Sequence, residues 1–508
     1  MTNSINRREF LKIAGLLSAN FLVPRIFTRP AIFQQNTTAQ NVLIVVFDAF
    51  SAFNISLYGY SRKTTSNIDR LADKAIVYHN HFAGGNFTTT GTASLLTGTL
   101  PWTHRAMVPS KTVAKDFAQK SLFHAFPTYH RLAYTHNTFA DHILDTFFAD
   151  IDDLTPRESL YRQSDALINL LFKKDDDIAS LSWTRALKQQ EDNTNYSLFL
   201  SHLYNTYRQQ KYKELQGHFP RGVPNINADN YFLLEDGIDW LNNQLISAPR
   251  PFLGYYHFLP PHGPYATRDD FFGTFAKDRY RPPRKPRNVF HEGIAYERLI
   301  NQRTWYDEFI LYVDAEFARL YRNLEQAGLL ENTWVILTSD HGELFERGMS
   351  GHSTPLLYQS IIRIPLIIFP PGQQSRIDIF EKTSAIDILP TLAHLTHQEI
   401  PEWTEGTILP PFSTQASSSK KDIFVLRSDE TKVNAPIKEG AVTIVRENYK
   451  LIYYFGYEEL DGSELIELFD IENDPEELED LYSSHKGIAN ELLKAVKDKI
   501  EEVNRPYI

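Results

Sequence analysis

Two apolar segments of this chain each lead into an aspartate, and this pairing constrains the fold more than any other feature. The run 41–47 leads into Asp48, and the run 334–337 leads into Asp340 and His341. Such continuous apolar runs predict strands that are buried on both faces, as in a parallel sheet. Because the carboxyl ends of parallel strands meet at one edge, these side chains predict a metal site there. The alternative is that the Asp-His pair only caps a turn or a helix.

The composition narrows the classes of function. The chain has 508 residues, a formal charge of -11 and 42% hydrophobic residues. This suits roughly two or three folded units with large cores. The negative charge without a basic patch argues against a nucleic-acid partner. The chain has no cysteine, which excludes disulfides, thiolate ligands and a cysteine nucleophile.

Residues 1–34 resemble an export signal of the twin-arginine type, which would place the protein in the periplasm or outside the cell. Arg7 and Arg8 precede the apolar run 13–23. A helix of this run spans only about 17 Å, less than the roughly 30 Å hydrocarbon core of a membrane, so we expect no transmembrane span. A surface helix with a chance arginine pair is the alternative.

A hydroxyl-rich loop, residues 86–98, runs into a short apolar helix and contains Thr88, Thr89 and Thr90. Free N–H groups at the start of a helix attract anions and stabilise a deprotonated hydroxyl. The loop is therefore a candidate site for an anion and a nucleophile. A threonine-rich helix cap without chemistry is the alternative.

The chain divides into three predicted regions. The export signal is followed by a catalytic domain, 35–410, and by a C-terminal subdomain, 411–508, that begins in a Ser- and Pro-rich passage. Within the catalytic domain, residues 151–244 are polar and charged and predict a helical insertion. This insertion either borders the site or is a solvated excursion from the fold.

A series of motifs spans the chain from about residue 40 to the C-terminus. They are 41–48, 58–60, 67–72, 93–98, 261–265, 339–343, 351–352, 363–368, 386–391, 449–452 and 468–475. In this order they resemble the sulfatase branch of the alkaline phosphatase superfamily. The resemblance implies an α/β fold, with a central mostly parallel or mixed sheet between helices and a smaller C-terminal antiparallel sheet plus helix.

The resemblance singles out Thr88, which lies ten residues before Gly98. Sulfatases hold at this offset the Cys or Ser that becomes formylglycine, and the sister branch of nucleotide pyrophosphatase/phosphodiesterases holds a threonine nucleophile. Oxidation of threonine would give a ketone, so Thr88 would attack as an alkoxide and form a covalent intermediate. Such a hydroxyl needs activation, which metal coordination can provide.

The resemblance also implies one divalent metal ion, bound by Asp48, Thr88, Asp340 and His341. Sulfatases commonly carry a second aspartate after the first, where this chain has Ala49. An all-oxygen calcium cage is therefore disfavoured, and zinc or manganese suits the predicted ligands better, with calcium as the alternative.

Two histidines match family positions that bind the non-bridging oxygens of the substrate or protonate the leaving group. They are His262 and His352, and histidine can do either near neutral pH. His257 stays open between such a role and a structural one. Tyr255 and Tyr256 beside it are interpreted as strand core.

Two departures separate the chain from ordinary sulfatases. Thr92 replaces the arginine that supports formylglycine, and the segment 133–139 replaces the lysine-containing segment that clamps sulfate.

We expect an exported, metal-dependent hydrolase of a phosphate or sulfate ester, acting on a small anionic ester or on an envelope or glycan component. The alternatives are a phosphoethanolamine or glycerol-phosphate transferase of the cell envelope, and a non-catalytic protein that binds anions.

Changing both Arg7 and Arg8 to lysine should block passage through the twin-arginine route, because the receptor reads the arginine pair. Cell fractionation followed by immunoblotting should find the variant as precursor inside the cell. A variant that is exported as well as wild type would show that residues 1–34 are not such a signal.

Overall fold

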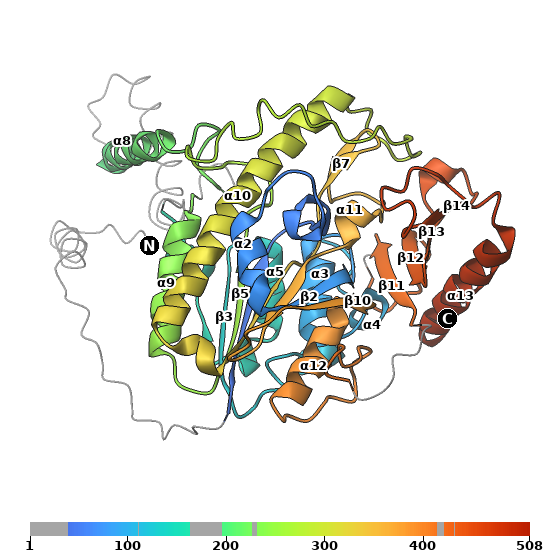
Figure 1. The fold of residues 1–508 in the computed structure, drawn as a ribbon, viewed down its shortest axis with the longest axis horizontal. Helices are drawn as coiled ribbons and strands as arrows, with labels where there is room; N and C mark the ends of the chain where they lie inside the picture. Colours follow the sequence, from blue (N-terminus) through green and yellow to red (C-terminus); the bar gives the residue numbers. More distant parts are fainter. Residues whose placement is uncertain (1–38, 110, 163–195, 226–230, 414–420, 431) are drawn as a thin grey trace, which may run out of the picture. The chain divides into compact units, whose positions relative to one another are not determined.

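The computed structural model describes residues 39–508 except 110, 163–195, 226–230, 414–420 and 431 (Figure 1). The predicted export signal, 1–34, and part of the predicted insertion lie outside the described residues. Within the described ranges, no helix combines the length and the apolar character that a membrane span requires.

Eight strands form the main sheet. They are β1 (Asn41–Phe47), β2 (Ile76–Phe82), β3 (His130–Thr135), β4 (Asp153–Leu154), β5 (Phe252–Phe258), β6 (Thr333–Thr338), β9 (Leu366–Phe369) and β10 (Ile377–Ser384). Their order is β10-β2-β9-β6-β1-β5-β3-β4. β9 is antiparallel to β2 and β6, and the other neighbouring pairs are parallel. The predicted mixed sheet is confirmed.

Helices cover both faces of this sheet (Figure 1). One face packs against α2 (Ser66–Leu71), α9 (Leu234–Ser247) and α10 (Tyr296–Gln326), and the other against α3 (Thr88–Thr97), α5 (Thr138–Thr146) and α12 (Ile388–Leu395). In β1, Leu43 and Val45 point to the first set, and Val42 and Ile44 to the second. Successive side chains of a strand point to opposite faces of the sheet. A strand that is covered on both faces is therefore apolar at every position. Each such side chain stabilises the fold by about 1.5–3 kcal/mol.

A smaller antiparallel sheet follows, made of β11 (Ile423–Ser428), β12 (Gly440–Arg446), β13 (Tyr449–Phe455) and β14 (Leu465–Asp470) in this order. Helix α13 (Lys486–Asn504) packs on it through Leu492 and Val496. The Leu426 N–H of β11 donates to the Gly84 carbonyl (3.2 Å), in the loop before α3. The predicted antiparallel sheet plus helix is confirmed. Through β11, this smaller sheet is hydrogen-bonded to the loop that precedes α3.

Besides short 3-10 helices, the other elements among the described residues are α4 (Pro101–His104), α8 (Tyr196–Gln216), α11 (Gln359–Ile362) and the hairpin of β7 (Leu344–Glu346) and β8 (Met349–Gly351). At the two ends of the predicted insertion, β4 pairs with β3 and α9 packs against α10. The predicted domain boundaries stay a prediction.

Helix α2 receives its N-terminal cap from α10. Its N-cap residue Thr65 makes no side-chain cap bond. Instead, Asp314 of α10 accepts from the Asn67 N–H (3.0 Å), from Asn67 Nδ2 (2.7 Å) and from the Ile68 N–H (2.7 Å). Burial raises the pKa of Asp314 to about 6 despite these bonds. The carboxylate therefore joins two helices that are distant in sequence.

In mildly alkaline buffer, where Asp314 is ionised, Asp314→Ala should lower the free energy of unfolding by about 1–3 kcal/mol, because buried N–H groups lose their acceptor. Chemical denaturation followed by circular dichroism measures this. Asp73→Ala changes an exposed carboxylate near the same helix and should have an effect below about 0.5 kcal/mol. Equal losses in the two variants would contradict the capping role.

Candidate active site

Adjacent parallel strands bring the two predicted aspartates together. Val46 of β1 pairs with Thr338 of β6, and Asp48 and Asp340 each lie two residues beyond that pair. Asp48 is 0% exposed and Asp340 is 1% exposed. The N–H of Ala49 donates to Asp340 Oδ1 (3.2 Å). The two carboxylates thus lie at one edge of the sheet, shielded from water.

His341 faces both carboxylates. Its Nε2 lies 3.4 Å from Asp48 Oδ1, 3.5 Å from Asp340 Oδ2 and 3.4 Å from Thr88 Oγ1. Its Nδ1 lies 2.8 Å from the Gly342 carbonyl oxygen. Because a carbonyl only accepts hydrogen bonds, the neutral ring carries its proton on Nδ1 and presents a lone pair at Nε2.

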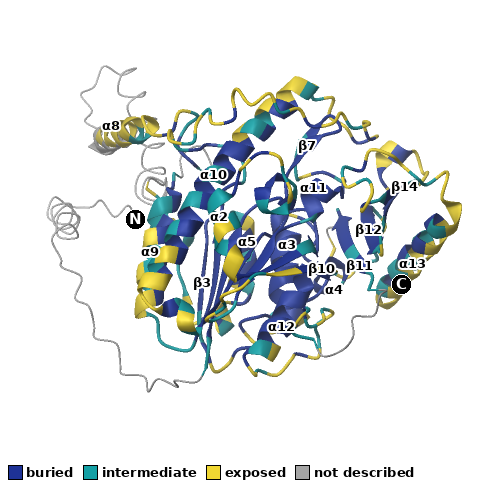
Figure 2. Cartoon of the chain, viewed as in Figure 1, coloured by how far each residue is buried: buried dark blue, intermediate teal, exposed yellow. Residues whose placement is uncertain are grey.

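Thr88 is the first residue of α3, a helix whose ten residues are all buried (Figure 2). The N-cap residue, Phe87, makes no side-chain cap bond, so no side chain at the N-cap occupies the N–H groups of the first turn. Gly91 allows the helix to pass close to the aspartate, since a Cβ there would lie 2.1 Å from the Asp340 carbonyl oxygen. This close approach places the Thr88 hydroxyl beside the carboxylates.

His257, which the sequence left open, belongs to the same cluster. It lies on β5 opposite Val46 of β1, and its Nε2 is 3.3 Å from Asp48 Oδ2 and 3.7 Å from Asp340 Oδ2. Asp48, His257 and Asp340 each offer a metal-ligand atom within 4.8 Å of the others. The adjacency of β5 and β1 brings His257 here, and the sequence does not reveal it.

Asn137 is a site residue that the sequence analysis missed. Its Nδ2 donates to Asp48 Oδ2 (2.5 Å) and to Thr88 Oγ1 (3.2 Å). Its Oδ1 accepts from the Phe139 N–H (2.7 Å) and so caps α5. The available signal was an asparagine just after strand β3 and at the start of a helix, which is a typical N-cap position.

His262 and His352 complete the cluster. The His352 ring centre lies 4.3 Å from that of His341 and 4.8 Å from that of His262. His352 Nδ1 is 3.1 Å from Glu343 Oε1, and Glu343 raises the pKa of His352 against the opposing effect of burial. His262 Nδ1 donates to the Gly263 carbonyl (2.6 Å). All the predicted site residues therefore lie in one group.

The buried carboxylates repel each other, and their pKa values move apart. Burial, with the Asp48 charge nearby, raises the pKa of Asp340 to about 7. Burial would also raise the pKa of Asp48, but His262, His257 and His341 hold it well below its usual range. Asp340 and Asp48 raise the pKa of His257 against the effect of its burial. The histidines therefore do not fully balance the negative charge of the two carboxylates.

Three polar atoms at the centre have no hydrogen-bond partner among the described residues. They are Asp48 Oδ1, Asp340 Oδ2 and His257 Nε2. Buried polar atoms are normally paired, so three unpaired atoms of metal-ligand type in one place fit a bound cation. The His341 lone pair adds a fourth ligand atom to the same centre.

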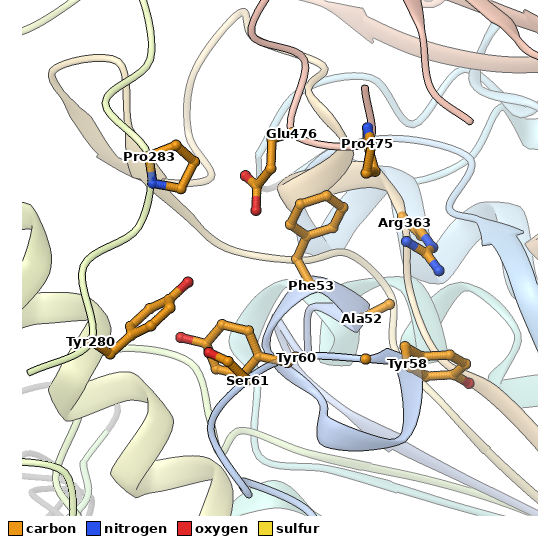
Figure 3. A pocket seen from close by; sticks show the side chains of 11 residues that line it. Ala52, Phe53, Tyr58, Tyr60, Ser61, Tyr280, Pro283, Arg363, Pro475 and Glu476 are labelled. Carbon is orange, nitrogen blue, oxygen red and sulfur yellow. The ribbon is translucent and has the colours of Figure 1, made fainter. Parts of the chain in front are cut away.

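A separate cavity of about 360 Å³ is lined by aromatic and charged side chains, including Phe53, Tyr60, Tyr280, Arg363 and Glu476 (Figure 3). None of the candidate site residues lines it. The chemistry is therefore argued from the carboxylate–histidine cluster and not from this cavity.

Fold and site together define an α/β protein with an acid–histidine cluster and a buried hydroxyl at the carboxyl edge of a mixed sheet. The family model described as Sulfatase matches residues 40–398, and the chain belongs to this family. The model described as N-sulphoglucosamine sulphohydrolase, C-terminal, matches residues 352–506. The family predicted from the sequence motifs is confirmed.

Individual relatives are distant. Arylsulfatase K of Bos taurus is 25% identical over 286 residues, which cover 50% of this chain and 52% of the relative. Choline-sulfatase of Rhizobium meliloti is 25% identical over 308 residues, which cover 54% and 57%. The chain thus spans about half the length of the curated relatives it matches. The phosphonate monoester hydrolase of Agrobacterium radiobacter superposes with a TM-score of 0.64 at 19% identity, covering 92% of this chain and 96% of that one, which shows a shared fold.

Asp340→Asn should weaken binding of a divalent metal more than about 100-fold, since loss of an outer partner alone typically costs 10–100-fold. Elemental analysis after dialysis, together with titration of the metal-free protein, measures this. Asp314→Asn, which changes a carboxylate that is 2% exposed on α10, is the control and should bind metal like wild type. Equal metal content in wild type and Asp340→Asn would show that the ion binds elsewhere.

Proposed function

We propose that this chain is a hydrolase that depends on one divalent metal ion and cleaves a sulfate- or phosphate-type ester through a covalent Thr88 intermediate. The observation that carries the proposal is the Thr88 hydroxyl. Its oxygen lies 3.4 Å from His341 Nε2 and 3.2 Å from Asn137 Nδ2, beside the buried aspartates. Membership of the sulfatase family supports the hydrolase class.

The residues that would hold the metal are Asp48, Thr88, Asp340, His341 and His257. Relative to the predicted set, His257 is an addition supported by its distances to both carboxylates. Two imidazoles with two carboxylates suit zinc or manganese better than calcium. When bound, the ion would offset the carboxylate charges and lower the pKa of the Thr88 hydroxyl.

In the first step, Thr88 attacks as the alkoxide, its hydroxyl proton having been released to solvent. Its oxygen forms a bond to sulfur or phosphorus, and the bond to the leaving oxygen breaks. Asn137 Nδ2, which already donates to Thr88 Oγ1, holds the attacking oxygen in place. The N–H groups of the first turn of α3 favour the negative charge that develops. His352, whose protonated form Glu343 favours, or its neighbour His262 donates a proton to the leaving oxygen.

In the second step, water attacks the same sulfur or phosphorus atom and the bond to the Thr88 oxygen breaks. The histidine that gave up its proton accepts one from the water, and Thr88 leaves as the alkoxide that begins the next cycle. The product is inorganic sulfate or the corresponding phosphorus acid. The cycle needs no oxidised side chain, in keeping with threonine at this position.

The substrate class follows from the shared anionic group. Relatives are named arylsulfatase and choline-sulfatase, and a structural neighbour is named phosphonate monoester hydrolase. We propose a sulfate ester or a phosphorus monoester or diester, carried by a small molecule or by an envelope or glycan component. Action outside the cytoplasm follows if residues 1–34 are an export signal.

Thr88→Ala should lower turnover by at least about 10³-fold, because it removes the nucleophile and one metal ligand together. The assay is a panel of sulfate monoesters, phosphate monoesters, phosphonate monoesters and phosphodiesters with metal-loaded protein. Thr88→Ser should keep part of the activity, since it retains the hydroxyl and loses only the methyl group that restricts the rotamer.

Thr89→Ala and Thr90→Ala are the matched controls and should lose far less. Mass spectrometry of protein quenched during turnover should find the sulfuryl or phosphoryl adduct on Thr88. An adduct on Thr89 or Thr90 would overturn the mechanism. Metal-loaded protein that turns over no member of the panel would favour the non-catalytic alternative.

A further inference from the structure

Tyr255 lies next to His257 on strand β5, with both side chains on the face covered by α3. Residues two apart on a strand point the same way, and Tyr255 belongs to the apolar cluster on that face. Its hydroxyl lies 3.3 Å from His257 Nδ1, and the two rings are nearly perpendicular, at 88°. Both residues are 0% exposed, so no water competes for this contact.

The other nitrogen of His257, Nε2, has no hydrogen-bond partner of good geometry among the described residues. It lies 3.3 Å from Asp48 Oδ2 and 3.7 Å from Asp340 Oδ2, at ion-pair distance from both. It is directed between the two carboxylates, where a cation would sit. To bind a cation, Nε2 must present a lone pair, and Nδ1 must then carry the ring proton.

For each histidine of the site, the hydrogen-bond partner of Nδ1 decides which ring nitrogen carries the proton. In His341 and His262, Nδ1 meets a carbonyl oxygen, which only accepts, so the tautomer is fixed. In His257, Nδ1 meets the Tyr255 hydroxyl, which can accept or donate. Thr92 of α3 lies beside the same hydroxyl, and Thr92 Oγ1 has no hydrogen-bond partner of good geometry among the described residues. The tyrosine proton can therefore turn toward Thr92, which leaves the tyrosine oxygen to accept from Nδ1.

We propose that Tyr255 is a positioning residue that accepts a hydrogen bond from His257 Nδ1, and so fixes the tautomer and the ring orientation in which Nε2 binds the metal ion. This inference rests on the metal-dependent function proposed above. It assigns a role to Tyr255 beyond strand core, and to Thr92 as the acceptor of the tyrosine proton. Outer hydrogen-bond partners of this kind typically change metal affinity 10–100-fold.

The neighbouring residue offers a matched control. Tyr256 is also 0% exposed, but it points to the opposite face of β5, where its hydroxyl donates to Gln244 Oε1 (2.9 Å). Tyr255→Phe and Tyr256→Phe each remove one buried hydroxyl from the same strand. They differ in whether the lost partner is the histidine.

The test measures metal binding to the full, metal-free protein and does not depend on activity. Zn²⁺ affinity is measured by competition with a chromophoric chelator, and the visible spectrum of the Co²⁺-loaded protein reports the ligands. We expect Tyr255→Phe to bind Zn²⁺ about 10–100-fold more weakly and to alter the Co²⁺ spectrum. Tyr256→Phe should match wild type in both. Thr92→Val, which leaves the tyrosine in place, should weaken binding in the same direction and keeps the proposal testable if Tyr255→Phe fails to fold.

Three outcomes would overturn the inference. Tyr255→Phe and Thr92→Val with the affinity and spectrum of wild type would show that the contact does not position His257. Equal losses in Tyr255→Phe and Tyr256→Phe would reduce the effect to general loosening of β5. Wild-type protein that binds no Zn²⁺, Mn²⁺ or Co²⁺ would overturn the metal dependence of the proposed function first, and this inference with it.

Discussion

The site depends on the repulsion between two buried carboxylates. Asp48 and Asp340 end neighbouring strands and are almost fully shielded from water. Two like charges without solvent cost several kcal/mol unless positive charge compensates them. His257 and His341 approach both carboxylates, yet the pKa of Asp340 still rises to about 7. A divalent cation is the compensation that this geometry fits best, and the unpaired oxygen and nitrogen atoms mark where it would bind.

The surrounding fold holds this unfavourable arrangement in place. Ala49, the residue after Asp48, has a φ of 58°, which is strained for a side chain with a Cβ. Its N–H donates to Asp340 and its carbonyl accepts from the Tyr306 hydroxyl of α10 (2.6 Å). On the other side, Gly91 lets α3 approach the Asp340 backbone. Both layers of helices therefore contribute to the position of one carboxylate pair, so the two carboxylates and the Thr88 hydroxyl share a rigid frame.

The sequence predicts the parts of this frame that follow from strand pattern. Asp48 and Asp340 could be placed together because each follows a continuous apolar run, and the motif order supplied Thr88, His341, His262 and His352. Asn137 was missed and His257 was left open between two roles, because the place of each depends on which strands are neighbours. The position of β5 beside β1 is a tertiary fact with no local signal. The interpretation of Tyr255 as strand core describes its burial correctly. The hydrophobic pattern of the sequence cannot show that its hydroxyl contacts a histidine.

The net charge of the site determines which ester substrates it can stabilise. A divalent ion would neutralise the two carboxylates and leave little net positive charge for the substrate. At the segment where the resemblance implies a lysine clamp, the structure places the neutral Asn137. We infer that the remaining stabilisation comes from neutral hydrogen-bond donors, namely Asn137 and the first turn of α3, with the protonated form of His352 as a single cationic donor. A group with one negative charge can be held by such donors alone, whereas a group with two negative charges has more need of a fixed cation. For the function proposed above, we expect this balance to favour sulfate monoesters, phosphonate monoesters and phosphodiesters over phosphate monoesters, because the first three carry one negative charge at the reacting centre near neutral pH and the last carries close to two.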